Sequence, residues 1–181
     1  MPSEALWFAS AISSARVVSR KAVFDYIDFR RDMEGLAAER AARLGSDTDL
    51  AVVDSVFQRM EAAHKKRDPS NEAQLDADFH LAIIEASHNV VMLHMMRSMY
   101  ELLREGVFYN RQVMFRQRTT RQNLLDQHRK INDALQARDP KAARAAIEAH
   151  MNYVAQALTD HLKAEKHEAI ARQRLAHESG R

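Results

Sequence analysis

Cysteine is absent from this chain of 181 residues, which excludes disulfide bonds and thiolate metal ligands. Glycine and proline number only 4 and 3, which argues against a loop-rich or β-rich fold. No apolar run approaches the ~18 residues of a membrane span. The N-terminus lacks the basic start and apolar core of a secretory signal. These absences make a soluble cytoplasmic protein, without a membrane partner, the default expectation.

Excess charge of either sign is also lacking. The 27 Lys and Arg residues nearly balance the 25 Asp and Glu residues, for a net charge of +2. So small a positive excess gives little electrostatic attraction for nucleic acid. What the chain has in quantity is Ala, Leu, Arg, Glu, Met and Gln, all good helix formers. The composition therefore predicts an all-α domain with one hydrophobic core.

Apolar residues recur at helical spacing along most of the chain and predict six or seven helices. The expected ranges are 2–12, 20–44, 47–67, 71–87, 90 onward to a break at 117–120, 120–136 and 140–162. Gly45 should end the second helix, Asn89 should cap the one that begins at 90, Gly106 should kink that helix, and Asp139 should cap the last. We expect a short helix and connection over 1–19, a helical domain over 20–163, and a frayed or disordered polar tail over 164–181.

The predicted helix beginning near Val90 carries a stripe of methionines. Met92, Met95, Met96 and Met99 follow the i, i+3, i+4, i+7 spacing of one helix face. Such a stripe is typical of ordinary core or of an adaptable surface for a partner. This helix should therefore be central in the bundle or buried in a dimer.

Asp76 and His80 are the residues that point most directly to chemistry. Four residues apart on a helix, their side chains stack on one face and can bind one metal ion. His128 and His150 lie on the apolar stripes of two later helices. A lone histidine on an apolar face is more often a core residue with a hydrogen-bond partner, but three of them with an acid favour a metal centre. The competing carboxylate, Asp78, falls on another face of its helix.

Three imidazole nitrogens and one carboxylate oxygen suit Zn²⁺, Ni²⁺ or Mn²⁺ rather than Ca²⁺. The sequence leaves the choice among these three open. Arg30 and Glu34 form a further i, i+4 pair, for which two interpretations compete. In the first, the two residues form a surface ion pair worth about 0.3–0.5 kcal/mol. In the second, Arg30 points into a cavity and binds a substrate carboxylate through two guanidinium nitrogens. Spacing alone favours the surface pair.

Four segments resemble, in order, the motifs of the FCD domain, the effector-binding half of FadR-type regulators in the GntR superfamily. They are Arg30-x-x-x-Glu34, Asp76-x-x-x-His80-x-x-Ile83-x-x-Ala86-Ser87-His88-Asn89, Gln127-His128-x-x-Ile131-x-x-Ala134-Leu135-x-x-x-Asp139 and Ala145-x-x-x-x-His150. The resemblance covers about residues 23–162. It implies an antiparallel helical bundle, a homodimer, and one divalent metal bound by Asp76, His80, His128 and His150.

The resemblance also implies an effector whose carboxylate binds at or near the metal. The stretch 85–91 is similar to regulators that answer lactate, glycolate or pyruvate, so we expect a small 2-hydroxy or 2-oxo acid. Arg30 and Asn89 are the predicted effector-binding residues. Family members carry an N-terminal winged helix-turn-helix, yet only about twenty residues precede the first long helix here. We therefore expect DNA contact only through a domain that is not part of this chain.

Two other functions stay open. A helical metalloenzyme would need an open metal position and a general base, for which Glu85 is a weak candidate. A structural module would use the metal only to tie helices together. We expect a sensor rather than an enzyme.

Overall fold

The computed structural model describes residues 20–102 and 118–179. Within these ranges every element is an α-helix, which confirms the predicted all-α class. The helices are α2 (Arg20–Leu44), α3 (Asp47–Lys66), α4 (Pro69–Ala86), α5 (Val90–Leu102), α7 (Arg118–Gln136) and α8 (Pro140–Ser179). The expected helix over 2–12 and the expected kink at Gly106 lie outside the described residues. Of the expected break over 117–120, only residue 117 lies outside them, and α7 begins at Arg118, two residues earlier than expected.

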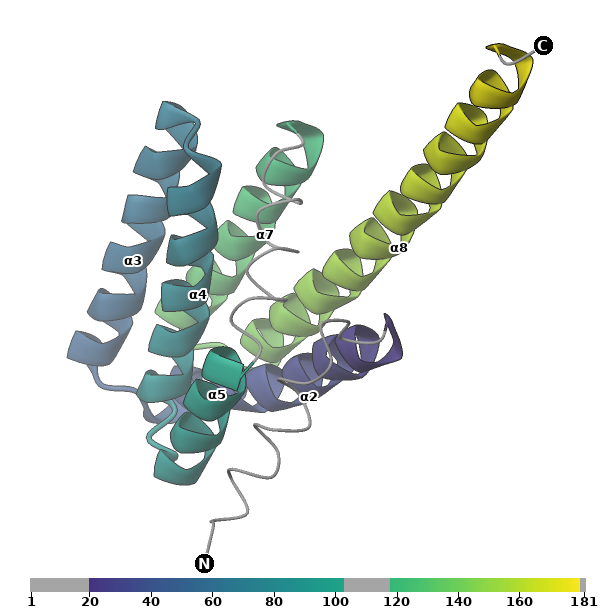
Figure 1. Cartoon of the computed structure of the whole chain (residues 1–181). Helices are drawn as coiled ribbons and strands as arrows, with labels where there is room; N and C mark the ends of the chain where they lie inside the picture. Colours follow the sequence, from purple (N-terminus) through teal and green to yellow (C-terminus); the bar gives the residue numbers. More distant parts are fainter. Residues whose placement is uncertain (1–19, 103–117, 180–181) are drawn as a thin grey trace, which may run out of the picture.

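The helices pack as a bundle in which short connections join α2 to α3, α3 to α4, α4 to α5 and α7 to α8. α3 packs against α4 and α7, α7 packs against α8, and α2 lies along α8 and α4. Figure 1 shows α3, α4 and α7 standing near one another, with α8 running past them and out of the bundle. None of the described helices is both long and apolar enough to cross a membrane.

Side-chain caps explain where the helices start. An N-cap oxygen that accepts a hydrogen bond from a backbone N–H three residues later satisfies one of the unpaired donors of a first helical turn. Such caps begin α3, α4, α5 and α8, and the capping residues are Ser46, Asp68, Asn89 and Asp139. At Ser46 the cap is reciprocal, because the Asp49 carboxylate accepts the Ser46 backbone N–H at 2.8 Å. The predicted caps at Asn89 and Asp139 are confirmed.

Gly45 directly follows the end of α2, as predicted, but not through a left-handed backbone. Its φ is not positive. Its N–H donates to the Ala41 carbonyl at 2.9 Å. A Cβ at this position would lie 2.6 Å from the same carbonyl oxygen. The chain needs glycine here because the backbone of the preceding turn comes too close for any side chain.

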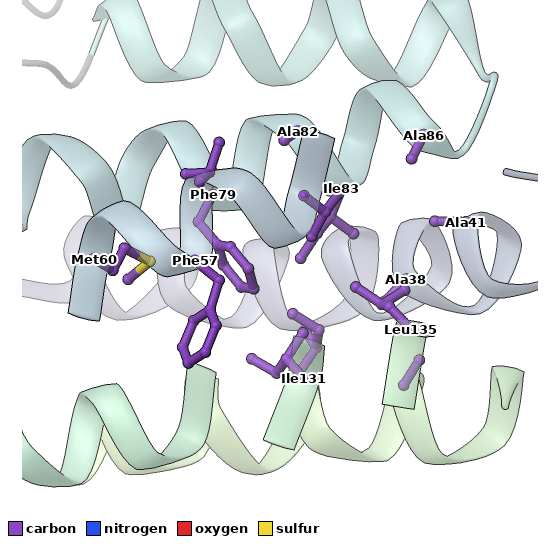
Figure 2. Close-up of a cluster of buried hydrophobic side chains, with 14 of the residues drawn as sticks. Ala38, Ala41, Phe57, Met60, Phe79, Ala82, Ile83, Ala86, Ile131 and Leu135 are labelled. Carbon is purple, nitrogen blue, oxygen red and sulfur yellow. The ribbon is translucent and has the colours of Figure 1, made fainter. Parts of the chain in front are cut away.

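The hydrophobic core lies where α2, α3, α4, α7 and α8 meet. Figure 2 shows Phe57, Phe79, Ile83 and Ile131 directed toward one another from three different helices. The Phe57 and Phe79 rings have centroids 6.2 Å apart. Full burial of each such side chain stabilises the fold by about 1.5–3 kcal/mol. This core surrounds the polar cluster described below and fixes the spacing of the helices that carry it.

The expectation that helical structure fades after Leu162 is wrong. α8 continues to Ser179, and its side chains from Lys163 to Glu178 are exposed. This segment is rich in Ala, Glu, Lys and Arg, which favour a helix without tertiary packing. An i, i+4 contact between Glu168 and Arg172 at 2.9 Å adds to it. The polar composition was read correctly, but strong local helix formers keep the segment ordered.

α5 lies at the edge of the described bundle rather than at its centre. Met92 and Met96 are buried against residues of α2 and α4. The opposite face is exposed, with relative accessibilities of 65%, 68% and 47% for Val90, Val91 and Met95. Of the two expectations for this helix, a central position is wrong. Burial in a dimer stays a prediction.

Candidate metal centre

Four buried side chains from three helices meet inside the bundle. Asp76 and His80 come from α4, His128 from α7 and His150 from α8. Each offers one ligand atom, and these four atoms lie within 4.8 Å of one another. The three histidines are at most 1% exposed and Asp76 is 5% exposed. The structure thus brings together all four residues that the sequence singled out as metal ligands.

The ligand atoms are spaced as one small cation requires. His128 Nε2 lies 3.1 Å from Asp76 Oδ1 and 3.3 Å from His80 Nε2. His80 Nε2 lies 3.9 Å from the same Asp76 oxygen. Tetrahedral coordination with bonds of 2.0–2.1 Å places neighbouring nitrogens about 3.3 Å apart. Binding a cation therefore requires only small side-chain adjustments.

Two of the three imidazoles have a polar neighbour on the side away from the cluster. His150 Nδ1 lies 2.9 Å from Gln127 Oε1. His80 Nδ1 lies 2.8 Å from Glu34 Oε2, although this contact is not aligned with the ring N–H direction. A metal-binding histidine usually has such a partner, which fixes its tautomer and leaves the other nitrogen for the metal. The surroundings of His80 and His150 therefore match those of metal ligands.

Burial keeps these imidazoles in the form a metal needs. Burial lowers the pKa of His80, against the opposing effect of Glu34. Burial and the neighbouring His128 lower the pKa of His150 well below its ordinary value. Both rings are therefore neutral near pH 7, with a lone pair available. Three imidazoles and one carboxylate fit Zn²⁺, Ni²⁺ or Mn²⁺ better than an ion such as Ca²⁺, which prefers oxygen ligands.

A small pocket borders the cluster on the α7 side. His128 forms part of its wall, and its Nδ1 is buried without a hydrogen bond to any described residue. Arg121 and Glu72 line the same pocket and are paired with each other, with Arg121 Nε donating to Glu72 Oε2 at 3.0 Å. The remaining lining residues are Met60, His64 and Leu125. A small pocket lined by both polar and apolar side chains thus reaches one residue of the cluster.

The interpretation of Arg30 and Glu34 as a surface ion pair is wrong. Both are buried, at 4% and 1% exposure, beside the cluster. Arg30 donates to Glu34 through Nε at 2.6 Å and Nη2 at 3.2 Å. Burial alone would raise the pKa of Glu34, but Arg30 and His80 hold it well below its usual range. Arg30 lies beside the cluster through Glu34, which contacts His80, and its guanidinium group is bonded to that carboxylate of the chain itself.

Sequence reasoning missed the approach of Glu34 to His80. Its signal was present, because Arg30 and Glu34 fall on the same helical stripe as Ile27 and Ala38, which are core residues. A charged pair on an apolar stripe is a buried pair. The partner of Glu34 on another helix could not be read from spacing.

The structure does not bring Asn89 to the cluster. Its side chain caps α5 by accepting the Met92 backbone N–H at 3.1 Å. Between His80 and the end of α4 the chain already advances about 9 Å along the helix axis. An effector-binding role for Asn89 stays a prediction that this geometry does not support. Asp78 lies on another face, as expected, and its carboxylate accepts from Gln74 at 2.9 Å.

Comparison with known proteins adds a family to this geometry. Residues 25–153 match the model of the FCD domain family. The chain is 35% identical over 131 residues to the putative L-lactate dehydrogenase operon regulatory protein of Escherichia coli K12, covering 72% of this chain and 49% of that protein. It is 32% identical over 153 residues to the Glc operon transcriptional activator of the same strain, covering 83% and 60%. The chain thus spans about half of each relative's length.

Solved structures show the same fold at lower identity. Escherichia coli McbR/YncC superposes with a TM-score of 0.70 at 18% identity, covering 87% of this chain and 79% of that one. A GntR family regulator from Pseudomonas syringae superposes with a TM-score of 0.62 at 22% identity, covering 86% and 62%. At these identities the likeness concerns the arrangement of helices.

Proposed function

The chain belongs to the FCD domain family of GntR-type regulators, and we propose that it senses a small 2-hydroxy or 2-oxo monocarboxylic acid at a divalent metal. Asp76, His80, His128 and His150 would hold the metal. The observation that carries the proposal is the convergence of these four buried ligand atoms within 4.8 Å. The relatives of this chain are named as transcriptional regulators. The buried cluster and these relatives together support a sensing role rather than catalysis.

The charges around the cluster favour a single carboxylate as the ligand. A bound divalent metal would supply two positive charges and open coordination positions. Asp76 neutralises one of those charges. The two buried arginines nearby are already matched, Arg30 by Glu34 and Arg121 by Glu72. One positive charge remains without a partner in the described chain, and one carboxylate balances it without leaving a buried charge unpaired.

The choice among small acids rests on the relatives and on size. One relative is named for the operon of L-lactate dehydrogenase. A 2-hydroxy or 2-oxo acid offers a second oxygen next to its carboxylate, which suits a metal with open positions. The pocket beside His128 is small and its floor is partly apolar through Met60 and Leu125. A compact acid therefore fits this site better than a long or multiply charged one.

The experiment is calorimetric titration of the metal-loaded protein with lactate, pyruvate, glycolate and citrate. A monocarboxylic acid should bind, and citrate should bind more weakly because it brings excess negative charge. The His128→Ala variant should lose this binding. A His88→Ala variant is the matched control, since His88 is exposed and contacts Asp49 rather than the cluster. Equal binding by wild type and His128→Ala would remove the metal from the sensing mechanism.

Two alternatives fit the structure less well. Glu85, the candidate general base of an enzyme, is exposed and paired with Arg97 rather than directed at the cluster. If the metal had a purely structural role, adding metal would raise the unfolding temperature, but small acids would then shift it no further. The titration above separates this second case from the sensor.

We further propose that the domain forms a homodimer through the exposed face of α5. Val90, Val91 and Met95 form an apolar surface on a peripheral helix, which is a common property of interfaces. Light scattering should give a dimer for wild type and a monomer for Val91→Glu. Operator DNA would be bound by a winged helix-turn-helix outside this chain, and the dimer would set the spacing of two such domains. A monomeric wild type would contradict this part of the proposal.

A further inference from the structure

Glu34 is the point at which three helices meet next to the metal cluster. Its Oε1 accepts hydrogen bonds from Arg30 Nε at 2.6 Å and from the Tyr100 hydroxyl at 3.0 Å. Its Oε2 accepts from Arg30 Nη2 at 3.2 Å and lies 2.8 Å from His80 Nδ1. Arg30 and Glu34 belong to α2, Tyr100 to α5 and His80 to α4. Both oxygens of one buried carboxylate are thus used, and one of them faces a ligand of the cluster.

This arrangement has a chemical consequence for His80. An ionised carboxylate accepts hydrogen bonds but cannot donate them, so it favours a proton on the ring nitrogen that faces it. With the proton on Nδ1, the lone pair of His80 lies on Nε2, which points into the cluster beside His128 and Asp76. Arg30 stabilises the ionised form of Glu34, because a buried carboxylate without a neighbouring cation would strongly destabilise the fold.

We propose that Glu34 is a positioning residue of the metal centre: it fixes the tautomer and orientation of His80 and links the cluster to α5 through Tyr100. The inference rests on the proposed function, since it assigns Glu34 a role toward the same metal. The effector-binding role expected for Arg30 stays a prediction beside it. Arg30 holds Glu34 in its ionised form, and Glu34 in turn acts on the ligand.

The link to α5 gives this contact a second role. α5 has one buried face against α2 and α4 and one exposed apolar face. Tyr100 lies on α5 and its hydroxyl donates directly to Glu34. Any shift of His80 on ligand binding changes the position of Glu34, and the Tyr100 hydroxyl must follow or lose its acceptor. The surface of α5 is therefore linked to the metal centre through the Tyr100–Glu34 hydrogen bond and the close approach of Glu34 to His80.

The test compares Glu34→Gln with Glu72→Gln in the full chain. Both residues are buried carboxylates bonded to an arginine through two nitrogens, so their purely structural roles are alike. Glu72 contacts none of the four cluster residues through a hydrogen bond or ion pair, whereas Glu34 contacts His80. Affinity is measured by Co²⁺ titration, read from the visible absorption of the bound ion.

We expect Co²⁺ to bind about 10–100-fold more weakly to Glu34→Gln, as is usual when a partner of a metal-binding histidine is lost. The Glu72→Gln protein should lose a similar amount of stability. Glu72 lines the pocket beside His128, but its carboxylate is bonded to Arg121 and His64 rather than to a cluster residue. In a titration that contains no acid, this variant should therefore bind Co²⁺ as wild type does. Equal affinity for wild type and Glu34→Gln would overturn the positioning role. Equal weakening in both variants would also overturn it, because a general loss of packing would then explain the effect.

Two further measurements cover the case in which Glu34→Gln does not fold. The double variant Arg30→Met/Glu34→Leu removes both charges and leaves neither unpaired, and it too should bind Co²⁺ more weakly. Nitrogen-15 spectra of the histidine rings in the metal-free wild type should show His80 protonated at Nδ1. A proton on Nε2 instead would overturn the inference whatever the variants do. If wild type fails to bind Co²⁺ at all, the proposed metal-dependent function fails, and the ring spectra then decide the tautomer separately.

Discussion

Asp76 and Asp78 provide the sharpest test of the metal centre, because they lie two residues apart on the same helix. Asp76 is 5% exposed and belongs to the cluster, with His128 Nε2 at 3.1 Å. Asp78 is half-buried on another face and accepts from Gln74. Replacing each by Asn removes one negative charge and keeps the shape of the side chain. Only Asp76→Asn should weaken metal binding.

The size of the effect follows from mass action. Metal at 100 times its Kd stabilises the folded state by about 2.7 kcal/mol. For a chain of this length each kcal/mol shifts Tm by about 2–4 °C, so wild type and Asp78→Asn should gain about 5–11 °C. Loss of a charged ligand should raise Kd by at least about 100-fold, the upper end of the cost for outer partners. At the same metal concentration the gain in stability is then about 0.4 kcal/mol, and the Tm shift about 1 °C.

The assay is thermal unfolding followed by circular dichroism, with and without Zn²⁺, for the three proteins. Without metal, Asp76→Asn should change stability by no more than about 1 kcal/mol, since an amide oxygen can still accept from His128. Equal Zn²⁺-dependent shifts in all three proteins would refute the assignment of Asp76 as a ligand. A shift lost in Asp78→Asn but kept in Asp76→Asn would refute the geometry of the site.

Three other predictions concern the scaffold and are measured by chemical denaturation. Gly35→Ala should raise the free energy of unfolding by up to about 1 kcal/mol, because the added Cβ meets nothing closer than 3.5 Å. Gly45→Ala should instead destabilise the fold, because its Cβ would lie 2.6 Å from a backbone oxygen. Equal effects of the two substitutions would contradict this reasoning. Ser46→Ala should cost about 1 kcal/mol. Hydrogen bonds from Ser46 lower the pKa of Asp49, so this stabilisation is present above the unfolded carboxyl's pKa and is lost as pH falls through the folded pKa; Ser46→Ala should flatten that part of the pH profile. Deletion of 164–179 should lower helix content while leaving the denaturation midpoint unchanged, since its side chains lie in solvent up to position 178.

Local signals were enough to place the helices. Asn89 and Asp139 cap helices because their side chains accept a backbone N–H only three residues away, and such contacts can be predicted from the sequence. The four candidate metal ligands could also be predicted from the sequence, because Asp76 and His80 share a helix face and the other two histidines lie on apolar stripes. Their convergence needed the family resemblance, since nothing local tells which stripes face one another.

Long-range contacts account for what the sequence did not predict. Spacing is the same for a surface ion pair and a buried one, and only the apolar stripe shared with core residues indicates that Arg30 and Glu34 are buried. The contacts of Glu34 with α4 and α5 cannot be predicted from that stripe. The prediction for the C-terminal part of α8 was wrong for the opposite reason. Its polar composition was read as disorder, although strong helix formers need no tertiary contact over a stretch that continues an established helix.

The distribution of the four ligands over the chain bears on how the protein reaches its native state. Asp76 and His80 can meet as soon as one helix forms, but His128 follows 48 residues after His80 and His150 another 22. A partly folded chain therefore presents two or three of the four ligands, and all four meet only once both α7 and α8 have docked. Tight ion uptake would then mark completed assembly, and the ion would cross-link distant segments much as a covalent staple does. Newly made protein would acquire its cation last.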